Sequence, residues 1–422
     1  MEKDIERQLE VLSSGVLEVL PGDGLKSKIA AALKEKRGLV VKLGVDPTSP
    51  DLHLGHAVPL RKLRQFQDLG HKAVLIIGDF TALVGDPSGR STTRPALTPE
   101  QVAINAKTYT DQAFNILDDA PERLELRYNS KWLGKLDFAK ILELTARFTV
   151  AGLLVRDDFI KRYKAEQSIG LHEFLYPVMQ AYDSVEIKAD VELGGSDQKF
   201  NLLAGRELQE KLGQEPQVAL TLPLLEGTDG VRKMSKSYDN HIGLTFEPAD
   251  MFGKVMRVPD EAPGQPRFSL ILKYYQLALG YLPDKVAAIA ADLKTEALDP
   301  RDAKEELAWQ VTATYHGRDA ADAARGDFDA RFRKTSLDAG SVIAEPKDVP
   351  RDILGDDGRV WMPKLMVATG GAASNGEARR LIEQGGVRFK SELITDPAAD
   401  VKIEGGEILQ IGKRKVFQLV LA

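Results

Sequence analysis

Two histidines flank a leucine and a glycine in His53-Leu54-Gly55-His56, a combination that could bind phosphate. The segment follows an apolar run at residues 39–45, which predicts a buried strand, and precedes apolar residues at helical spacing from Ala57 to Leu69. A strand-to-helix turn presents free backbone N–H groups and the positive end of a helix dipole, and both favour a bound phosphate. Because Gly55 has no side chain, a purine or ribose can approach its backbone.

A zinc site is the competing interpretation of His53 and His56, since three-residue spacing places both rings on one face of a helix. The chain contains no cysteine, and we find neither a third histidine nor a nearby carboxylate that completes a ligand set. We therefore expect no tightly bound metal.

A second candidate segment is Lys233-Met234-Ser235-Lys236-Ser237, which follows the flexible stretch 226–230. Two ammonium groups on a mobile loop can close over a triphosphate and neutralise charge on the transferring phosphates. In isolation the segment is typical of a solvated, lysine-rich loop. Its occurrence together with the two histidines favours the phosphate-binding interpretation.

Tyr176, Gln180 and Asp183 are spaced by four and three residues in a segment with helical character, so they share one helix face. Apolar neighbours such as Val178 and Met179 supply other faces for burial. This arrangement predicts the wall of a polar pocket, with an exposed polar stripe as the alternative.

Two further loops follow predicted strands. Gly194-Gly195-Ser196-Asp197-Gln198 allows a tight turn in which Asp197 and Gln198 can hydrogen-bond a ribose diol. Thr81 lies shortly before residues 85–89, where Asp86 can meet an ammonium group. Turn formation alone explains the glycines and proline of these loops equally well.

Apolar strands at 39–45, 73–77, 124–128, 189–193 and 218–222 alternate with helical segments, and residues 1–36 read as helical. This alternation predicts an α/β fold, a doubly wound parallel-sheet (Rossmann-like) catalytic domain that binds ligands at the carboxyl ends of its strands. We expect this domain at 1–245 with a helical insertion at about 103–165. An α-helical domain at 246–343, a linker at 344–360 rich in proline, glycine and acidic residues, and a small, compact α+β domain at 361–422 would follow.

Composition fits this organisation. A chain of 422 residues exceeds one typical core, and 43% apolar and 28% charged residues are ordinary for a globular protein. The net charge of −6 (57 basic minus 63 acidic) argues against a general nucleic-acid coat protein, although residues 361–422 carry +2 (9 basic minus 7 acidic). A charged N-terminus and the lack of a membrane-spanning apolar run predict a cytoplasmic protein.

Together the four motifs resemble the tyrosyl-tRNA synthetases, a bacterial-type family of class I aminoacyl-tRNA synthetases, over essentially the whole chain. The resembling segments are Gly44-Val45-Asp46-Pro47-Thr48 with His53–His56, Tyr176-x-x-x-Gln180-x-x-Asp183, Gly194–Gln198 and Lys233–Ser237. The resemblance implies that His53, His56, Lys233 and Lys236 act on the phosphates. It implies ATP contacts from Asp46, Gly55, Asp197, Gln198, Met234, Ser235 and Ser237, and amino-acid contacts from Thr81, Asp86, Tyr176, Gln180 and Asp183.

Lys42 departs from the family pattern, because many members carry a tyrosine there that meets the substrate phenol. Either Lys42 takes over this tyrosine contact, or it pairs elsewhere, for example with Asp183.

The segment Ser374 to Val387 resembles the small RNA-binding domain shared with a ribosomal small-subunit protein. Arg379 and Arg380 on one helix, with the basic cluster at Lys413 and Arg414, suit a structured RNA surface. The family would use such a surface on its tRNA.

The resemblance therefore implies a tyrosine–tRNA ligase. It would form tyrosyl-adenylate from tyrosine and ATP, with Mg²⁺ arriving with ATP, and then charge tRNA(Tyr). It also implies a homodimer joined through the insertion. A tryptophanyl-tRNA synthetase shares both nucleotide motifs, and a non-catalytic RNA-binding protein on the same scaffold is the alternative from another class.

Overall fold

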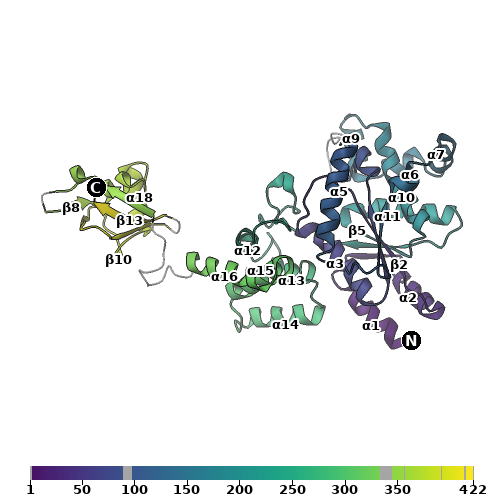
Figure 1. Cartoon of the computed structure of the whole chain (residues 1–422), viewed down its shortest axis with the longest axis horizontal. Coiled ribbons are helices and arrows are strands. Elements are labelled where there is room, and N and C mark those ends of the chain that lie inside the picture. Colours follow the sequence, from purple (N-terminus) through teal and green to yellow (C-terminus); the bar gives the residue numbers. More distant parts are fainter. Residues whose placement is uncertain are drawn as a thin grey trace. The chain divides into compact units, whose positions relative to one another are not determined.

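The structure is a computed structural model that describes residues 2–88, 97–332, 345–355, 357–390, 392–412 and 415–421. The chain forms two compact units, residues 1–322 and 323–422. Figure 1 labels their helices and strands. In the described ranges, no helix is long and apolar enough to cross a membrane.

A mostly parallel sheet forms the centre of the first unit, in the order β1-β6-β5-β2-β3-β4. Its strands are β1 (Glu18–Leu20), β2 (Val40–Val45), β3 (Lys72–Ile77), β4 (Leu124–Tyr128), β5 (Val191–Gly195) and β6 (Val218–Leu222). β3 and β6 are almost entirely buried, as expected for parallel strands covered on both faces. The doubly wound α/β prediction is confirmed.

β1 corrects the expectation that residues 1–36 are entirely helical. Helices α1 (Glu2–Ser13) and α2 (Gly24–Glu35) enclose this strand, which pairs antiparallel with β6. Glu18 faces Thr221 and Leu20 faces Ala219 in the register. Three residues are too short to show strand alternation, so only the pairing partner reveals the strand.

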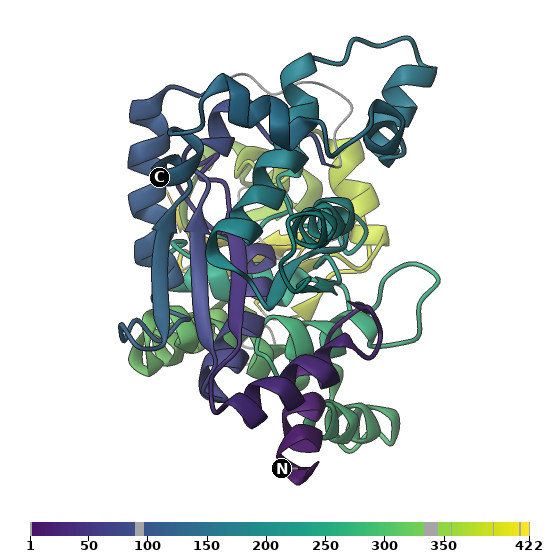
Figure 2. The same ribbon diagram turned by 90° about the vertical axis from the view of Figure 1, so that its right-hand side faces the viewer.

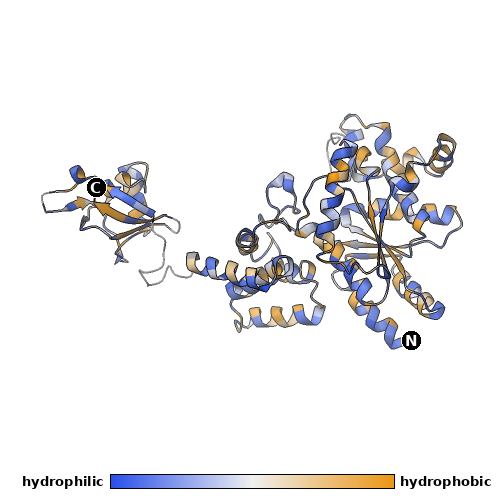
Figure 3. Cartoon of the chain, in the orientation of Figure 1, coloured by the Kyte–Doolittle hydropathy of each residue, from blue (hydrophilic) through white to orange (hydrophobic). Residues whose placement is uncertain are grey.

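Helices surround the sheet, and Figure 2 shows the chain after a turn of 90° about the vertical axis of Figure 1. They are α3 (Leu54–Asp68), α4 (Thr81–Val84), α5 (Pro99–Ala113), α6 (Ser130–Leu133), α7 (Phe138–Thr145), α8 (Val150–Leu154), α9 (Asp157–Lys164), α10 (Leu175–Ile187) and α11 (Lys199–Lys211), with 3-10 turns η1 (Leu171–Phe174), η2 (Ser196–Gln198) and η3 (Lys236–Tyr238). Most helices carry both hydrophilic and hydrophobic residues, whereas the central strands are largely hydrophobic (Figure 3). Such helices bury one side against the sheet.

A run of helices follows, as the sequence predicted: α12 (Pro248–Arg257), α13 (Ser269–Leu277), α14 (Pro283–Lys294), α15 (Pro300–His316) and α16 (Arg318–Phe332). Buried side chains such as Tyr274, Leu307 and Val311 give these helices an apolar interior. The first compact unit includes α12 to α15, and its boundary falls within α16.

The second unit has its own sheet, in the order β10-β9-β12-β13-β7, and a separate pair β11-β8. Its elements are β7 (Glu345–Val349), η4 (Arg351–Ile353), β8 (Arg359–Trp361), α17 (Met362–Ala368), α18 (Asn375–Glu383), β9 (Val387–Phe389), β10 (Glu392–Leu393), β11 (Asp400–Lys402), β12 (Ile408–Ile411) and β13 (Lys415–Leu421). The prediction of a linker at 344–360 is wrong for its described part. β7 pairs parallel with β13, and Val349 and Val360 belong to the domain core, so this stretch is part of the folded domain.

Candidate active site

Two adjoining pockets lie at the carboxyl ends of β2 and β5. The inner pocket has a volume of about 230 Å³, and the outer cleft about 490 Å³. Both are lined by His56, Pro59, Asp86, Gly195 and Gln198, so they communicate. This is the edge at which an open parallel sheet binds ligands.

Tyr176, Gln180 and Asp183 project from α10 into the wall of the inner pocket. Asp183 is buried and accepts hydrogen bonds from Trp132 Nε1 at 2.8 Å and Asn129 Nδ2 at 3.3 Å. Burial raises the pKa of Asp183 to about 6, although Lys42 and the two hydrogen bonds act in the opposite direction. The pocket therefore ends in an oriented, titratable acceptor.

Asp46 links β2 to α10 across the inner pocket. One carboxylate oxygen accepts from Thr81 Oγ1 at 2.7 Å and the other from Tyr176 Oη at 2.8 Å. A Cβ on Gly78 would lie 2.0 Å from Asp46 Oδ1 and 2.3 Å from Thr81 Oγ1, so this corner requires glycine. Asp46, expected among the ATP ligands, thus lies with the residues expected to bind the amino acid.

Asp86 and Gln198 meet between the two pockets. Gln198 Nε2 donates to Asp86 Oδ2 at 2.7 Å. Asp197, the neighbour of Gln198, lines the outer cleft and pairs with Lys233 at 2.9 Å. The predicted ribose turn therefore contacts both the inner pocket and the lysine-rich segment.

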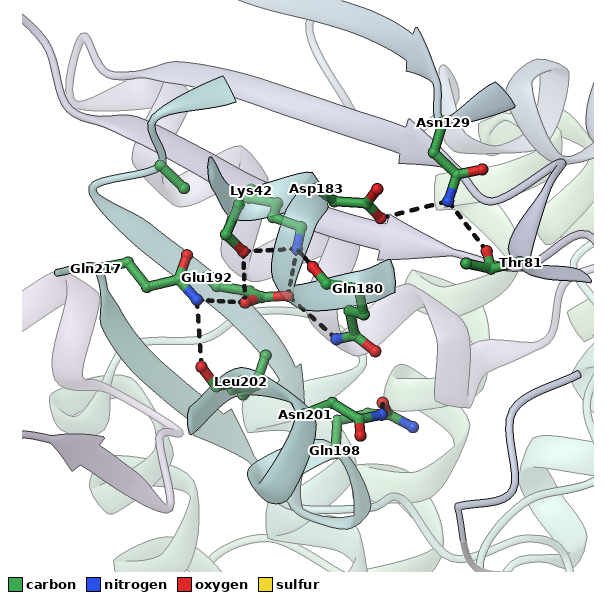
Figure 4. A network of polar contacts seen from close by, with 12 residues as sticks. Lys42, Thr81, Asn129, Gln180, Asp183, Glu192, Gln198, Asn201, Leu202 and Gln217 are labelled. Atoms are coloured by element: carbon green, nitrogen blue, oxygen red, sulfur yellow. Dashed lines mark hydrogen bonds and ion pairs between the residues drawn. The ribbon is translucent and has the colours of Figure 1, made fainter. Parts of the chain in front are cut away.

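Lys42 does not line the inner pocket, so the expected contact with the substrate phenol is not formed. It follows the alternative, pairing elsewhere, but its partner is Glu192 and not Asp183. Its side chain is 0% exposed and forms an ion pair with Glu192 Oε1 at 2.7 Å. The ammonium group also donates to Gln180 O at 2.9 Å and Ser184 Oγ at 2.8 Å (Figure 4). These partners use all three N–H bonds of the lysine.

The imidazoles of His53 and His56 lie side by side at the start of α3, with ring centroids 3.8 Å apart. Nδ1 of His56 accepts from the backbone N–H of His53 at 3.2 Å, so the neutral ring carries its proton on Nε2. Burial lowers the pKa of His53 to about 2 and that of His56 to about 4, and repulsion from Lys236 adds to both effects. Both rings are therefore neutral at pH 7. A Cβ on Gly55 would lie 3.0 Å from the His53 ring.

The lysine-rich segment forms the other side of the outer cleft. Lys233, Met234, Ser235 and Ser237 line the cleft opposite the histidines. Lys236 Nζ donates to Ser49 Oγ at 3.1 Å and lies 3.9 Å from Asp51 Oδ2. Desolvation lowers the pKa of Lys236, with Asp51 opposing the shift. Asn240 Oδ1 accepts from Ser235 N at 2.8 Å and orients the segment.

The predicted RNA-binding residues belong to the second unit. Arg379 and Arg380 are exposed on α18, and the Arg379 guanidinium lies 4.9 Å from the Trp361 ring centroid. Lys413 and Arg414 lie outside the described residues.

Sequence reasoning missed several residues of the site. Asn129 follows β4, is fully buried, and donates to both Thr81 and Asp183. Its position at a strand end was a usable signal, because the strand before it had been identified. No position directly after a predicted strand marks Trp132, Glu192 or Arg156. Each contacts a partner that is distant in the sequence.

Comparison with known proteins agrees with this geometry. The family model described as "tRNA synthetases class I (W and Y)" matches residues 34–333. The chain is 49% identical over 419 residues to a tyrosine–tRNA ligase of Moorella thermoacetica, covering 99% of this chain and 97% of that protein. It is 47% identical over 414 residues to that of Thermotoga maritima, covering 98% and 97%.

Solved structures share the fold. The tyrosyl-tRNA synthetase of Archaeoglobus fulgidus complexed with L-tyrosine superposes with a TM-score of 0.62 at 23% identity, over 76% of this chain and 99% of that one. The mitochondrial tyrosyl-tRNA synthetase of Coccidioides posadasii gives 0.61 at 24% identity, over 76% and 91%. From the family match and the full-length relatives, this chain belongs to the class I tRNA synthetases of the tryptophan and tyrosine type.

Proposed function

We propose that the protein is a tyrosine–tRNA ligase that activates tyrosine with ATP and transfers it to tRNA(Tyr). The observation that carries this proposal is the inner pocket, which ends in the oriented carboxylate of Asp183 and opens into a cleft lined by His53, His56 and Lys233. A phenol can donate a hydrogen bond to this carboxylate, whereas the side chain of phenylalanine cannot. Full-length similarity to tyrosine–tRNA ligases supports the same choice.

In the first step, a tyrosine carboxylate oxygen attacks the α-phosphorus of ATP, and the bond to pyrophosphate breaks. Asp46, Thr81, Asp86, Tyr176 and Gln180 line the pocket in which the ammonium group would bind. His53 and His56 would donate hydrogen bonds to the phosphate oxygens as neutral imidazoles, and Lys233 and Lys236 would neutralise the departing pyrophosphate. In the second step, a hydroxyl of the terminal tRNA ribose attacks the tyrosyl carbonyl and releases AMP.

Lys233 must change partner when ATP binds. Its ammonium lies 2.9 Å from Asp197, a residue proposed to bind the ribose, and both side chains are partly exposed. An exposed ion pair of this kind contributes little stability, so nucleotide phosphates can compete for the lysine at small cost. Asp197 is then released toward the ribose. Met234, Ser235 and Ser237 would complete the nucleotide contacts.

We assign Mg²⁺ to the phosphates of ATP rather than to a protein site. In the parts of the chain that the structure describes, no group of three or more histidine, aspartate or glutamate side chains could hold a metal ion. Phosphate-bound Mg²⁺ needs no such group, because it keeps several waters and binds substrate oxygens. It would supply charge neutralisation.

The second unit would bind tRNA through Arg379 and Arg380, with Lys413 and Arg414 as further candidates. Both arginines are exposed on one helix, which suits contacts to a folded RNA backbone. This role implies that the protein works in the cytoplasm, where its tRNA is charged.

We further propose a homodimer formed through the insertion. Within the insertion, the large apolar side chains that are more than half exposed include Phe138, Leu142, Val150 and Val155. Several large exposed apolar residues in one segment are typical of an interface. The double substitution Phe138→Asp/Val155→Asp should give monomers by light scattering, whereas a wild-type monomer at micromolar concentration would contradict the proposal.

Amino-acid-dependent exchange of pyrophosphate into ATP tests the first step. We expect exchange with tyrosine and little with tryptophan or phenylalanine. Exchange with tryptophan alone would contradict the assigned substrate. A folded protein that exchanges with no amino acid would support a non-catalytic RNA-binding function instead.

A further inference from the structure

A buried ion pair lies directly behind the inner pocket and is not accounted for by the proposed chemistry. Lys42 on β2 and Glu192 on β5 are partners in the parallel register of the two strands, and their side chains are 0% and 1% exposed. Burying two charges is costly unless additional hydrogen bonds satisfy both groups. The surrounding residues supply these bonds.

The four hydrogen-bond donors around Glu192 fix how its neighbours are oriented. Oε1 accepts from Lys42 and from Gln180 Nε2 at 3.1 Å. Oε2 accepts from Ser184 Oγ at 3.1 Å and from Gln217 Nε2. Lys42 also donates to Ser184 Oγ, so the serine proton must point to Glu192. Each hydrogen bond in this cluster therefore has a defined donor and acceptor.

The consequence concerns Gln180, whose side chain lines the inner pocket. A carboxylate can only accept hydrogen bonds, so the atom of the Gln180 amide that faces Glu192 must be its NH₂ group. The carbonyl Oε1 of the same amide then points away from Glu192, as Figure 4 shows. An amide in this orientation offers an acceptor, and an ammonium group needs acceptors.

We propose that Lys42 and Glu192 are positioning residues for amino-acid binding, which orient the Gln180 amide so that its carbonyl accepts from the substrate ammonium group. Lys42 contributes by pairing with Glu192 Oε1 and by donating to the main-chain carbonyl of Gln180. The pair does not touch the substrate itself. This inference rests on the proposed tyrosine site and adds a specific selectivity, for the α-amino group rather than for the phenol.

The packing of α11 on α10 leaves space for this cluster at one glycine. A Cβ on Gly205 would lie 2.7 Å from Gln217 Nε2, 3.0 Å from Ser184 Oγ and 3.1 Å from Glu192 Oε2. Gly205→Ala would therefore displace the cluster from a position outside the pocket. Because alanine favours a helix, this substitution is expected to leave the fold intact.

The main test replaces the pair with apolar side chains of similar length, as Lys42→Met/Glu192→Met. Exchanging a whole buried pair avoids the unpaired charge that either single substitution would leave. The KM for tyrosine in pyrophosphate exchange should rise about tenfold, as expected for one lost hydrogen bond to a charged group. The inhibition constant of 3-(4-hydroxyphenyl)propionate, which lacks the amino group, should change less than about twofold. The preference for tyrosine over phenylalanine should remain.

Two companion variants make the result decisive. Gly205→Ala should show the same selective effect at smaller amplitude, and it provides the test if the double variant does not fold. Asp190→Asn removes a partner of Arg37 just before β5, at a residue that belongs neither to the pocket lining nor to the hydrogen-bonded cluster, so it should leave the ratio of the two constants unchanged.

Equal losses of tyrosine and of the amine-free analogue would show general damage to the pocket and would overturn the inference, as would no change in either. Measurements on the wild-type protein distinguish failure of this inference from failure of the proposed function. If wild type shows no tyrosine-dependent exchange, the proposed function fails. If wild type exchanges but the variants keep its selectivity, only the positioning role fails.

Discussion

Asp183, the proposed acceptor of the tyrosine hydroxyl, is a buried carboxyl group with a raised pKa. Its pKa of about 6 lies above the ordinary 3.8 because the group is buried; the charge of Lys42 on β2 acts against this shift and that of Glu192 on β5 adds to it. Below pH 6 the free enzyme protonates Asp183, so kcat/KM for tyrosine should fall about tenfold per pH unit. Steady-state pyrophosphate exchange between pH 5 and 8 measures this.

Protonation of Asp183 should weaken tyrosine binding without destabilising the fold. A pKa that is higher in the folded state means that the native protein binds the extra proton between pH 4 and 6. Through this group, acidification therefore stabilises the fold, and the lost activity cannot reflect unfolding caused by Asp183. Asp183→Asn should abolish the acid limb and raise the KM for tyrosine about 10- to 100-fold. If kcat/KM of this variant still fell below pH 6, the titrating group would be a residue other than Asp183.

His56 should contribute to the transition state rather than to ground-state binding. As a neutral donor it resembles one member of an oxyanion-binding pair, so His56→Ala should lower kcat about 10²- to 10³-fold, with a smaller change in KM for ATP. Because burial lowers its pKa to about 4, kcat at saturating tyrosine should be flat from pH 6 to 8. Rapid-quench measurement of adenylate formation tests both points. An acid limb in kcat near pH 6.5 would indicate a charged imidazole instead.

Residue types at fixed spacing identified much of this site without a structure. The shared face of Tyr176, Gln180 and Asp183 follows from helical geometry alone. The environment of Lys42 did not follow, because its partner Glu192 is set by the register between two strands far apart in the sequence. Pairing across a sheet is information that no local pattern contains.

At the scale of elements, Arg156 connects the insertion to the site. It precedes α9, is buried, and donates to Ser88 Oγ at 2.7 Å and Asn201 Oδ1 at 3.0 Å. Asn201 in turn donates to Gln198 Oε1 at 2.8 Å, and Arg156 lies 3.8 Å from Asp86. Asp86 and Gln198 line both pockets, so the insertion can influence amino-acid and ATP binding together.

Arg156→Met should therefore lower stability by about 3–5 kcal/mol, because it leaves buried acceptors unpaired, and should raise KM for both tyrosine and ATP. Arg147→Met is the matched control, since Arg147 forms a more exposed pair with Glu143 on the same insertion and should cost less than about 1 kcal/mol. Urea unfolding and exchange kinetics measure these effects. A change in only one KM would show that Arg156 does not couple the two pockets.

Local sequence patterns predict the apolar strands of the first unit closely. They do not predict strands that are recognised only by the strand with which they pair. The strands at 124–128 and 218–222 match β4 and β6 residue for residue. Local sequence does not reveal β1, which has three residues, or β7, which is rich in polar residues, because the evidence for each is the strand beside it. The acidic and proline-containing sequence of β7 is typical of a loop, and the parallel pairing with β13 overrides that local preference.

At the scale of the whole molecule, the sites proposed for amino-acid activation and for RNA binding lie in separate compact units. The pockets belong to residues 1–322, and the core of the second unit, from Val349 to Leu419, is formed by its own residues. Two units with separate cores can be altered independently when substitutions stay on the surface. Activation of tyrosine should therefore be insensitive to surface charge in the second unit, whereas tRNA charging should depend on it.

The arginines of α18 test this separation. Arg379→Gln/Arg380→Gln removes two exposed positive charges, and Arg379 also loses its contact with the Trp361 ring. The KM for tRNA should rise, and the slope of log affinity against log salt should become shallower by about 1.5, as expected for two lost phosphate contacts. Pyrophosphate exchange should stay at the wild-type rate. Lys402→Gln is the matched control, because Lys402 pairs with Glu404 on the exposed surface of the same unit. If both variants weakened tRNA binding equally, the effect would reflect net charge, and α18 would not be a specific RNA surface.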